Sequence, residues 1–92
     1  MVETASEPIY LLGVLRPAQC RAARALLNWS QIELAERAGI QVLALRRFET
    51  GRTDPRASTR DKIEKALADA GIELLEADAQ VGVKLHQGRS HD

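Results

Sequence analysis

The stretch "AERAGIQVLALRRFETGR", residues 35–52, decides the fold of this chain. Two glycines, Gly39 and Gly51, each follow a run of residues with the composition of a helix. Glycine ends helices because it adopts the left-handed backbone conformation without a steric penalty. Only Ile40 and Gln41 separate Gly39 from the second helical run, so two helices joined this tightly cannot lie antiparallel and must cross steeply. The stretch therefore predicts a helix, a tight turn and a second helix.

The first helix of this pair has a strong start signal in "SQIE", residues 30–33. In a capping box of this kind, the Ser30 hydroxyl accepts a hydrogen bond from the amide of Glu33, and the Glu33 carboxylate reaches back to the amide of Ser30. The predicted helix ends at Gly39. Its apolar side is expected to consist of Ile32, Leu34, Ala35 and Ala38.

The second helix of the pair is predicted over residues 42–50, and its apolar spacing indicates which side faces inward. Leu45 and Phe48 stand three residues apart, and we expect them to point inward with Ala44 beside them. The outward side is then formed by Val42, Leu43, Arg46 and Arg47.

Two further helices are expected around this unit. One begins near Pro17, a favoured first helical residue, and runs to about Leu27. Its expected apolar positions are Ala18, Ala22, Ala25, Leu26 and Leu27. The other is capped by Ser58 or Thr59, ends at Gly71, and carries Ile63, Ala66, Leu67 and Ala70 at helical spacing.

The ends of the chain differ in character from its centre. "IELL" at 72–75 and "VGVKL" at 81–85 predict a β-hairpin over residues 72–86, with a polar turn at 76–80. "IYLLGVL", residues 9–15, is bounded by two prolines and predicts a short strand. The expected organisation is a flexible tail at 1–8, the strand at 9–15, a helical domain at 16–71, the hairpin at 72–86 and a second tail at 87–92.

Composition restricts the class of protein. Ninety-two residues form one domain with a modest core, and a lone cysteine, Cys20, cannot make an internal disulfide. The longest apolar run is far shorter than the ~20 residues of a membrane span, and no secretory signal is visible, so we expect a soluble, cytoplasmic protein. The formal net charge is +0, yet residues 16–62 hold ten basic and five acidic side chains. Such a basic block can dock on phosphate, although it can also be an ordinary solvated surface.

The central segment resembles the Cro/C1-type, or XRE-like, helix-turn-helix family of phage and bacterial repressors. The similarity covers roughly residues 18–70. The matching positions are Leu27, Trp29, Ser30, Gln31, Leu34, Ala35, Ala38, Gly39, Ile40, Leu45, Phe48, Glu49 and Gly51. The resemblance implies a mainly α fold of four helices, lambda-repressor-like, and a DNA-binding transcriptional regulator without a cofactor.

The resemblance also implies where DNA would bind, because the family places the second helix of the pair in the major groove. The base-reading candidates are then Gln41, Val42, Leu43, Arg46 and Arg47. An arginine can bind guanine with two hydrogen bonds, whereas Val42 and Leu43 can only pack on thymine methyl groups. The candidates for phosphate contacts are Arg24, Ser30, Gln31, Arg52 and Arg56, among which Gln31 resembles the family's phosphate-clamping glutamine.

This chain departs from the family at the start of the reading helix, where Ser or Gln and a later Thr are common. Here Val42, Leu43 and Ala44 stand instead, and a small exposed apolar patch can mark a protein contact. Two hypotheses follow. One is a sequence-specific regulator acting as a homodimer through the hairpin residues Ile72, Leu74, Val81, Val83 and Leu85. The other is a protein-interaction module, an antirepressor, antiactivator or antitoxin, whose partner is another regulator or a toxin.

Enzymatic activity and metal binding are not expected. His86 and His91 stand near the chain end with too few neighbouring ligands for a metal site. No glycine-rich phosphate loop or nucleophile arrangement is present in the sequence.

Overall fold

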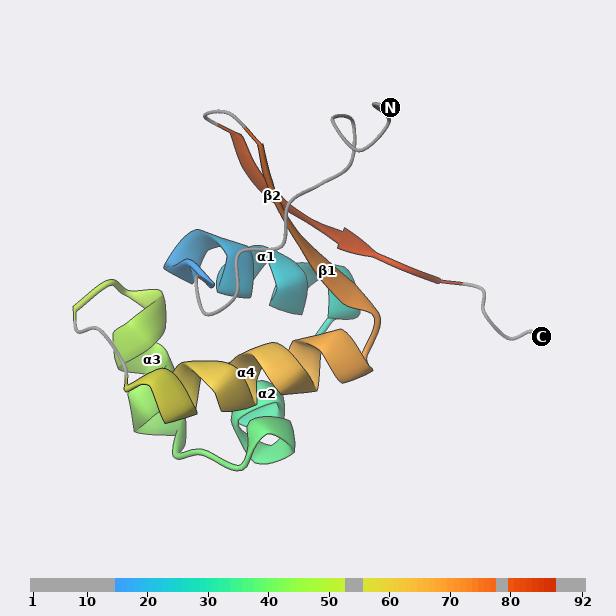
Figure 1. Cartoon of the computed structure of the whole chain (residues 1–92). Coiled ribbons are helices and arrows are strands. Elements are labelled where there is room, and N and C mark those ends of the chain that lie inside the picture. The colour runs from blue at the N-terminus through green and yellow to red at the C-terminus, as the bar shows by residue number, and fades with distance from the viewer. Residues whose placement is uncertain (1–14, 53–55, 78–79, 88–92) are drawn as a thin grey trace, which may run out of the picture.

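The computed structural model describes residues 15–52, 56–77 and 80–87, which form four helices followed by a two-stranded antiparallel sheet (Figure 1). The elements are α1 (Pro17–Leu27), α2 (Gln31–Ala38), α3 (Val42–Glu49), α4 (Ala57–Asp69), β1 (Ile72–Ala77) and β2 (Gln80–Leu85). The predicted mainly α fold with a C-terminal hairpin is confirmed. The strand predicted at 9–15 lies outside the described residues except for Leu15, which is buried and belongs to no strand.

The α2–α3 unit has the predicted tight turn. Gly39 caps α2 in the left-handed conformation, with φ 72° and ψ 35°, and the amide of Ile40 donates to the carbonyl of Ala35. At the start of α2, the Ser30 Oγ accepts from the Glu33 amide at 3.0 Å. The second half of the predicted capping box is wrong, because the Glu33 carboxylate binds the guanidinium of Arg37 one turn later.

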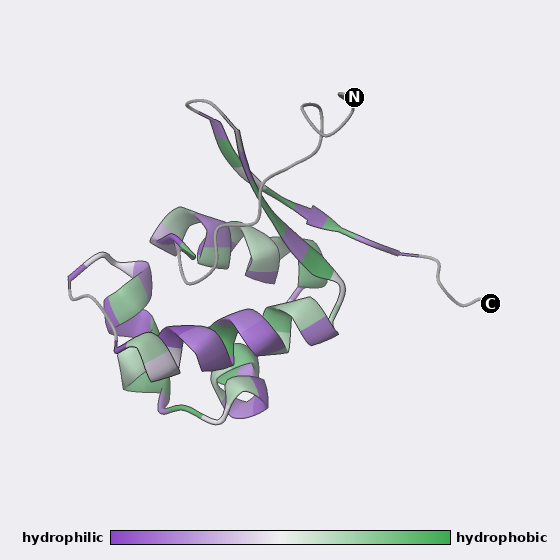
Figure 2. Cartoon of the chain, in the orientation of Figure 1, coloured by the Kyte–Doolittle hydropathy of each residue, from purple (hydrophilic) through white to green (hydrophobic). Residues whose placement is uncertain are grey.

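The core lies where the four helices meet. Its buried hydrophobic residues are Leu15, Cys20, Ala23, Leu34, Ala35, Ala38, Leu45, Phe48, Ile63, Ala66, Leu67 and Ile72. Figure 2 shows hydrophobic and hydrophilic residues alternating along the helices, as expected when each helix buries one side only. Burial of this apolar surface is the main stabilising contribution to the fold.

The buried side of α1 differs from the prediction. Gln19, Cys20 and Ala23 are the buried residues of this helix, whereas Ala18, Ala22, Ala25 and Leu26 are exposed. Alanine is tolerated on either side of a helix, so the alanines of "PAQCRAARALL" did not mark the inward face. On α2, Ile32 is also exposed, although the prediction placed it inside.

Two boundaries were also predicted wrongly. Helix α4 begins at Ala57 with Arg56 at the N-cap and no side-chain cap, so Ser58 and Thr59 lie within its first turn. Each strand of the hairpin has six residues, and the register pairs Ile72 with Leu85 and Ala77 with Gln80. The polar residues at 76 and 80 are therefore paired between the two strands and do not belong to a wide turn.

The hairpin packs on α1 and α4 (Figure 1), and polar contacts attach it to α1. The buried amide of Gln19 donates from Nε2 to the main-chain carbonyls of Leu75 and Gly82, at 3.2 and 3.1 Å. These two residues face each other across the strands, so one side chain binds both. Arg16 forms an ion pair with Glu76 beside this contact.

Gly71 makes the turn from α4 into β1 and is the point where the hairpin closes on the helix. Its φ is 99°, and its carbonyl accepts from the amide of His86 at 2.9 Å. A Cβ at this position would stand 2.9 Å from the main-chain oxygen of His86. A side chain is therefore excluded both by the backbone conformation and by lack of space.

We predict that Gly71→Ala lowers the free energy of unfolding by about 2 kcal/mol, because the variant must either hold a strained backbone or open the end of the hairpin. Urea denaturation followed by circular dichroism measures the loss. Gly82→Ala is the matched control, since a Cβ there meets no atom within 4 Å, and it should leave stability unchanged or slightly higher. Equal stability of the two variants would contradict this account of the turn.

Candidate nucleic-acid interface

The outward side of α3 is a surface of two arginines and two aliphatic residues. Arg46 and Arg47 are exposed, and Leu43 is 51% exposed. Val42 is only half-buried, because part of its side chain packs against the core. Ala44 is exposed, which corrects the expectation that it faces inward. The N-cap residue Gln41 is exposed beside this surface and makes no side-chain capping bond.

Gln31, the first residue of α2, lies between this surface and the core. Its Oε1 accepts from the Arg46 Nε at 3.2 Å, and its Nε2 donates to the Glu49 Oε1 at 3.0 Å. The start of α2 and the outward side of α3 therefore form one continuous surface, as the predicted arrangement requires.

Behind Gln31 lies a buried ionic cluster centred on Glu49, which is 1% exposed. Arg24 binds its carboxylate with two hydrogen bonds, from Nε to Oε2 and from Nη2 to Oε1, both 2.8 Å long. The Cys20 thiol donates to Oε2 at 3.0 Å, and Arg21 donates to the main-chain carbonyl of Glu49. The cluster joins α1, α2 and α3 around one charge.

The ionisation of this cluster follows from its contacts. Burial alone would raise the pKa of Glu49, but hydrogen bonds from Arg24, Cys20 and Gln31 outweigh it and hold the pKa below its ordinary value. The hydrogen bond to Glu49 raises the pKa of Arg24. Burial, together with the adjacent carboxylate, raises the pKa of the Cys20 thiol, so the thiol stays protonated and serves as a donor.

Two of the predicted phosphate ligands, Arg24 and Ser30, take part in hydrogen bonds within the chain. Arg24 is half-buried and uses Nε and Nη2 on Glu49 and Nη1 on the carbonyl of Trp29, so its guanidinium joins α1 to α3 and to the link before α2. The Ser30 hydroxyl oxygen is used by the helix cap. Arg52 and Arg56 are exposed on either side of residues 53–55, and neither side chain bonds to another residue that the structure describes.

The hairpin residues predicted to form a dimer surface mostly face the chain's own core. Ile72 is buried there and is not available to a partner. Leu74, Val83 and Leu85 are partly buried against the same core. Val81, at 42% exposure, is the most open of the five.

Sequence reasoning missed the roles of Glu49 and Gln19. Glu49 stands four residues after Leu45 and next to Phe48, so its spacing places it on the inward side of α3 and was a usable signal. Gln19 is adjacent to Cys20 on the buried side of α1, but its partners are main-chain carbonyls 56 and 63 residues away. No local pattern in the sequence reveals such a contact.

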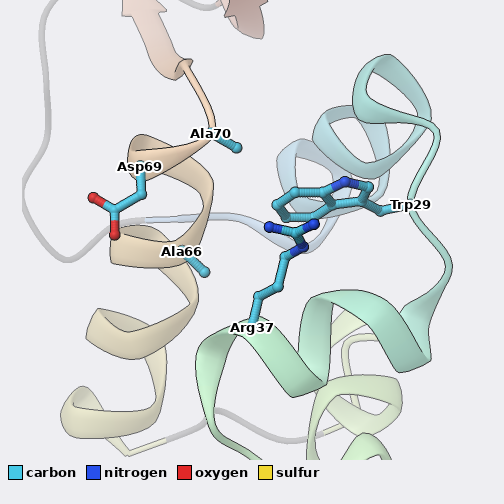
Figure 3. Close-up of a pocket in the computed structure, with 5 residues that line it drawn as sticks. All are labelled: Trp29, Arg37, Ala66, Asp69 and Ala70. Carbon is cyan, nitrogen blue, oxygen red and sulfur yellow. The ribbon is translucent and has the colours of Figure 1, made fainter.

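An open cavity of about 230 Å³ lies on another part of the surface, between α2 and α4. Figure 3 shows the guanidinium of Arg37 against the ring of Trp29, with Ala66 of α4 and its C-cap Ala70 on the facing side. The guanidinium carbon lies 4.3 Å from the ring centroid. The charged groups at the rim are already paired, Arg37 with Glu33 and Asp69 with Lys65. The cation–π contact of Arg37 therefore joins α2 to Trp29 in the link between α1 and α2.

The crossing of α2 and α3, and the exposed basic side of α3, define a DNA-binding helix-turn-helix domain. Comparison with protein families agrees, because the model of the helix-turn-helix family matches residues 21–68, just over half of the chain. The chain belongs to this family, in its Cro/C1-type form. The family is one of DNA-binding regulators and not of enzymes. Comparison with curated proteins found no match.

Within the described ranges, no helix has the length and apolar character to cross a membrane.

We predict that Glu49→Gln lowers the free energy of unfolding at pH 7 by about 3 kcal/mol, because it leaves Arg24 partly buried without its counter-charge. The pKa of Glu49 is lowered in the folded state, so its stabilising contribution is complete above the ordinary value of 4.5 and is lost as the pH falls through the folded value. The difference between the two proteins should therefore shrink below pH 4.5. Urea denaturation at several pH values measures it.

The matched control for this prediction is Glu36→Gln, which removes an exposed carboxylate on α2 that makes no side-chain bond within the described ranges. This control should change stability by less than about 0.5 kcal/mol. A constant difference between Glu49→Gln and the parent protein down to pH 2 would show that the cluster is not held by the charge of Glu49.

Proposed function

We propose that this protein is a sequence-specific transcriptional regulator that inserts α3 into the major groove of double-stranded DNA. The observation that carries the proposal is the outward side of α3, where Arg46 and Arg47 are both exposed beside the start of α2. A guanidinium fork matches the two acceptors of guanine, O6 and N7, and thereby distinguishes guanine from the other bases. As a DNA-binding regulator it would act in the cytoplasm.

The remaining residues of this surface have narrower roles in the proposal. Gln41 and Leu43 flank the arginines, and Leu43, with the exposed part of Val42, suits thymine methyl groups. Arg52 and Arg56 are exposed just beyond α3 and supply phosphate contacts, which position the domain without reading sequence.

A homodimer is the expected working form, because a single small domain buries too little DNA surface for tight, specific binding. The hairpin is the proposed contact. It lies on α1 and α4, contacts neither α2 nor α3 extensively, and so leaves the reading side open. Val81 provides an exposed apolar position near its end.

A second candidate function rests on a different observation. Leu43 and Ile32 are 51% and 54% exposed, one on each helix of the α2–α3 unit. Exposed aliphatic side chains on a recognition unit suit a protein partner, such as another regulator or a toxin. In this alternative the chain is an antirepressor, antiactivator or antitoxin.

Fluorescence anisotropy with DNA from the protein's own upstream region, over a salt series, tests the first function. We expect binding that weakens steeply with salt and prefers this DNA over a shuffled sequence of equal length. Arg52→Ala should weaken binding to both DNAs alike and reduce the salt slope by about 1, whereas Arg47→Ala should reduce the preference for one sequence. Lys65→Ala, which removes an exposed charge paired with Asp69, is the control and should leave both quantities unchanged.

Absence of DNA binding at low salt would exclude the regulator and favour the protein-interaction module. In that event Val42→Ala combined with Leu43→Ala should abolish capture of the protein partner, and Arg47→Ala should not.

Val81→Lys tests the dimer. A charge placed in the apolar contact should weaken self-association at least about tenfold, as measured by sedimentation equilibrium. Gln80→Lys is the matched control, because it adds the same charge to the neighbouring position, which faces the opposite side of the strand. A parent protein that stays monomeric at high concentration, or equal effects of the two variants, would contradict a dimer through this face.

A further inference from the structure

The oxygen and the nitrogen of the Gln31 side-chain amide each form a hydrogen bond, and the identity of the two partners determines which way the amide is oriented. The ionised Glu49 carboxylate only accepts hydrogen bonds, so the amide nitrogen of Gln31 must face it. The amide oxygen then faces the opposite way, where it accepts from the Arg46 Nε. Because the pKa of Glu49 is held low, this orientation persists throughout the neutral range.

The contact with Gln31 restrains Arg46 at one of its three nitrogens. Nε is bound, whereas Nη1 and Nη2 form no hydrogen bond or ion pair with another described residue. The free end of the guanidinium is the part that can form two parallel hydrogen bonds with a guanine edge. A side chain held in this way has less rotamer freedom to lose when DNA binds.

Arg47 provides the contrast on the same helix. Its side chain is exposed and takes part in no hydrogen bond or ion pair with the described residues. Arg47 can therefore adapt to either a base or a phosphate, but nothing within the described chain presents its guanidinium in one geometry.

We propose that Gln31 is a positioning residue that presents Arg46 to a guanine, which makes Arg46 the main specificity-determining side chain of the reading helix. In this arrangement the amide of Gln31 acts on Arg46 from its oxygen and is held by Glu49 at its nitrogen, a role additional to the phosphate contact that its resemblance to the family's glutamine implies. The buried carboxylate supports the arrangement from behind, since it polarises the amide and strengthens the bond to Arg46. The inference rests on the proposed DNA-binding function.

The test is a double-mutant cycle on base discrimination rather than on overall affinity. The parent protein first selects its preferred sequence from a randomised DNA library. The readout is the ratio of affinities for DNA with guanine and with adenine at the position that depends most on Arg46. We expect a ratio of about tenfold or more for the parent protein, and no discrimination for Arg46→Ala. Gln31→Ala should reduce the ratio several-fold, and should have no further effect when Arg46→Ala is already present.

Two further variants separate positioning from stability. Gln31→Lys keeps a donor for Glu49 but cannot accept from Arg46, so it should lose discrimination while its thermal unfolding temperature stays near that of the parent protein. Gln87→Ala removes an exposed glutamine that follows β2, and it should change neither property.

The failure of this inference is distinguishable from failure of the proposed function. If Gln31→Ala weakens binding to all sequences alike, and its effect adds to that of Arg46→Ala, Gln31 is a phosphate ligand and the inference is overturned while the regulator stands. If Arg47→Ala removes the discrimination and Arg46→Ala does not, the assignment of the reading side chain is overturned. If the parent protein selects no sequence, the proposed function fails and the inference fails with it.

Discussion

The Glu49 carboxylate is a charge almost completely removed from water, and removal of a charge from water is costly unless hydrogen bonds and a counter-charge replace the solvent. Its replacements come from three places in the chain: Arg24 and Cys20 on α1, and Gln31 on α2. The carboxylate can be accommodated only when these helices occupy one arrangement. The hydrophobic core favours compactness in general, whereas this cluster favours one particular packing of α1, α2 and α3.

The same cluster connects the interior with the exposed side of α3. A hydrogen-bonded path runs from buried Glu49 through half-buried Gln31 to exposed Arg46. A polar residue in the core thus has a consequence at the surface. The hairpin is attached elsewhere, to α1 through Gln19 and Arg16. The N-terminal end of α1 therefore holds the hairpin, whereas the middle of the same helix contributes to the ionic cluster.

Much of this fold could be predicted from the sequence because the residues that begin and end its helices act locally. Ser30 and Gly39 are the two caps of α2, and Gly51, with φ 74°, directly follows the C-cap of α3, so these residues mark the ends of helices by their own backbone chemistry. The buried side of α1 could not be predicted, because its many alanines fit either face and its buried polar residue depends on partners far along the chain. The sequence identified which residues belong to the candidate site, but it did not separate those that stabilise the fold from those that face the solvent. Arg24 and Arg47 look equivalent in the sequence, and only the position of Glu49 separates a structural arginine from an exposed one.

Gln19 holds the hairpin by main-chain carbonyls, which every amino acid possesses, and not by side chains. The outward side chains of β1 and β2 can therefore be exchanged during evolution without weakening this attachment. At Gly82 a larger side chain would extend into open space. A protein built in this way can acquire a new partner through its hairpin, or lose an old one, while the α2–α3 unit keeps its structure and its ligand.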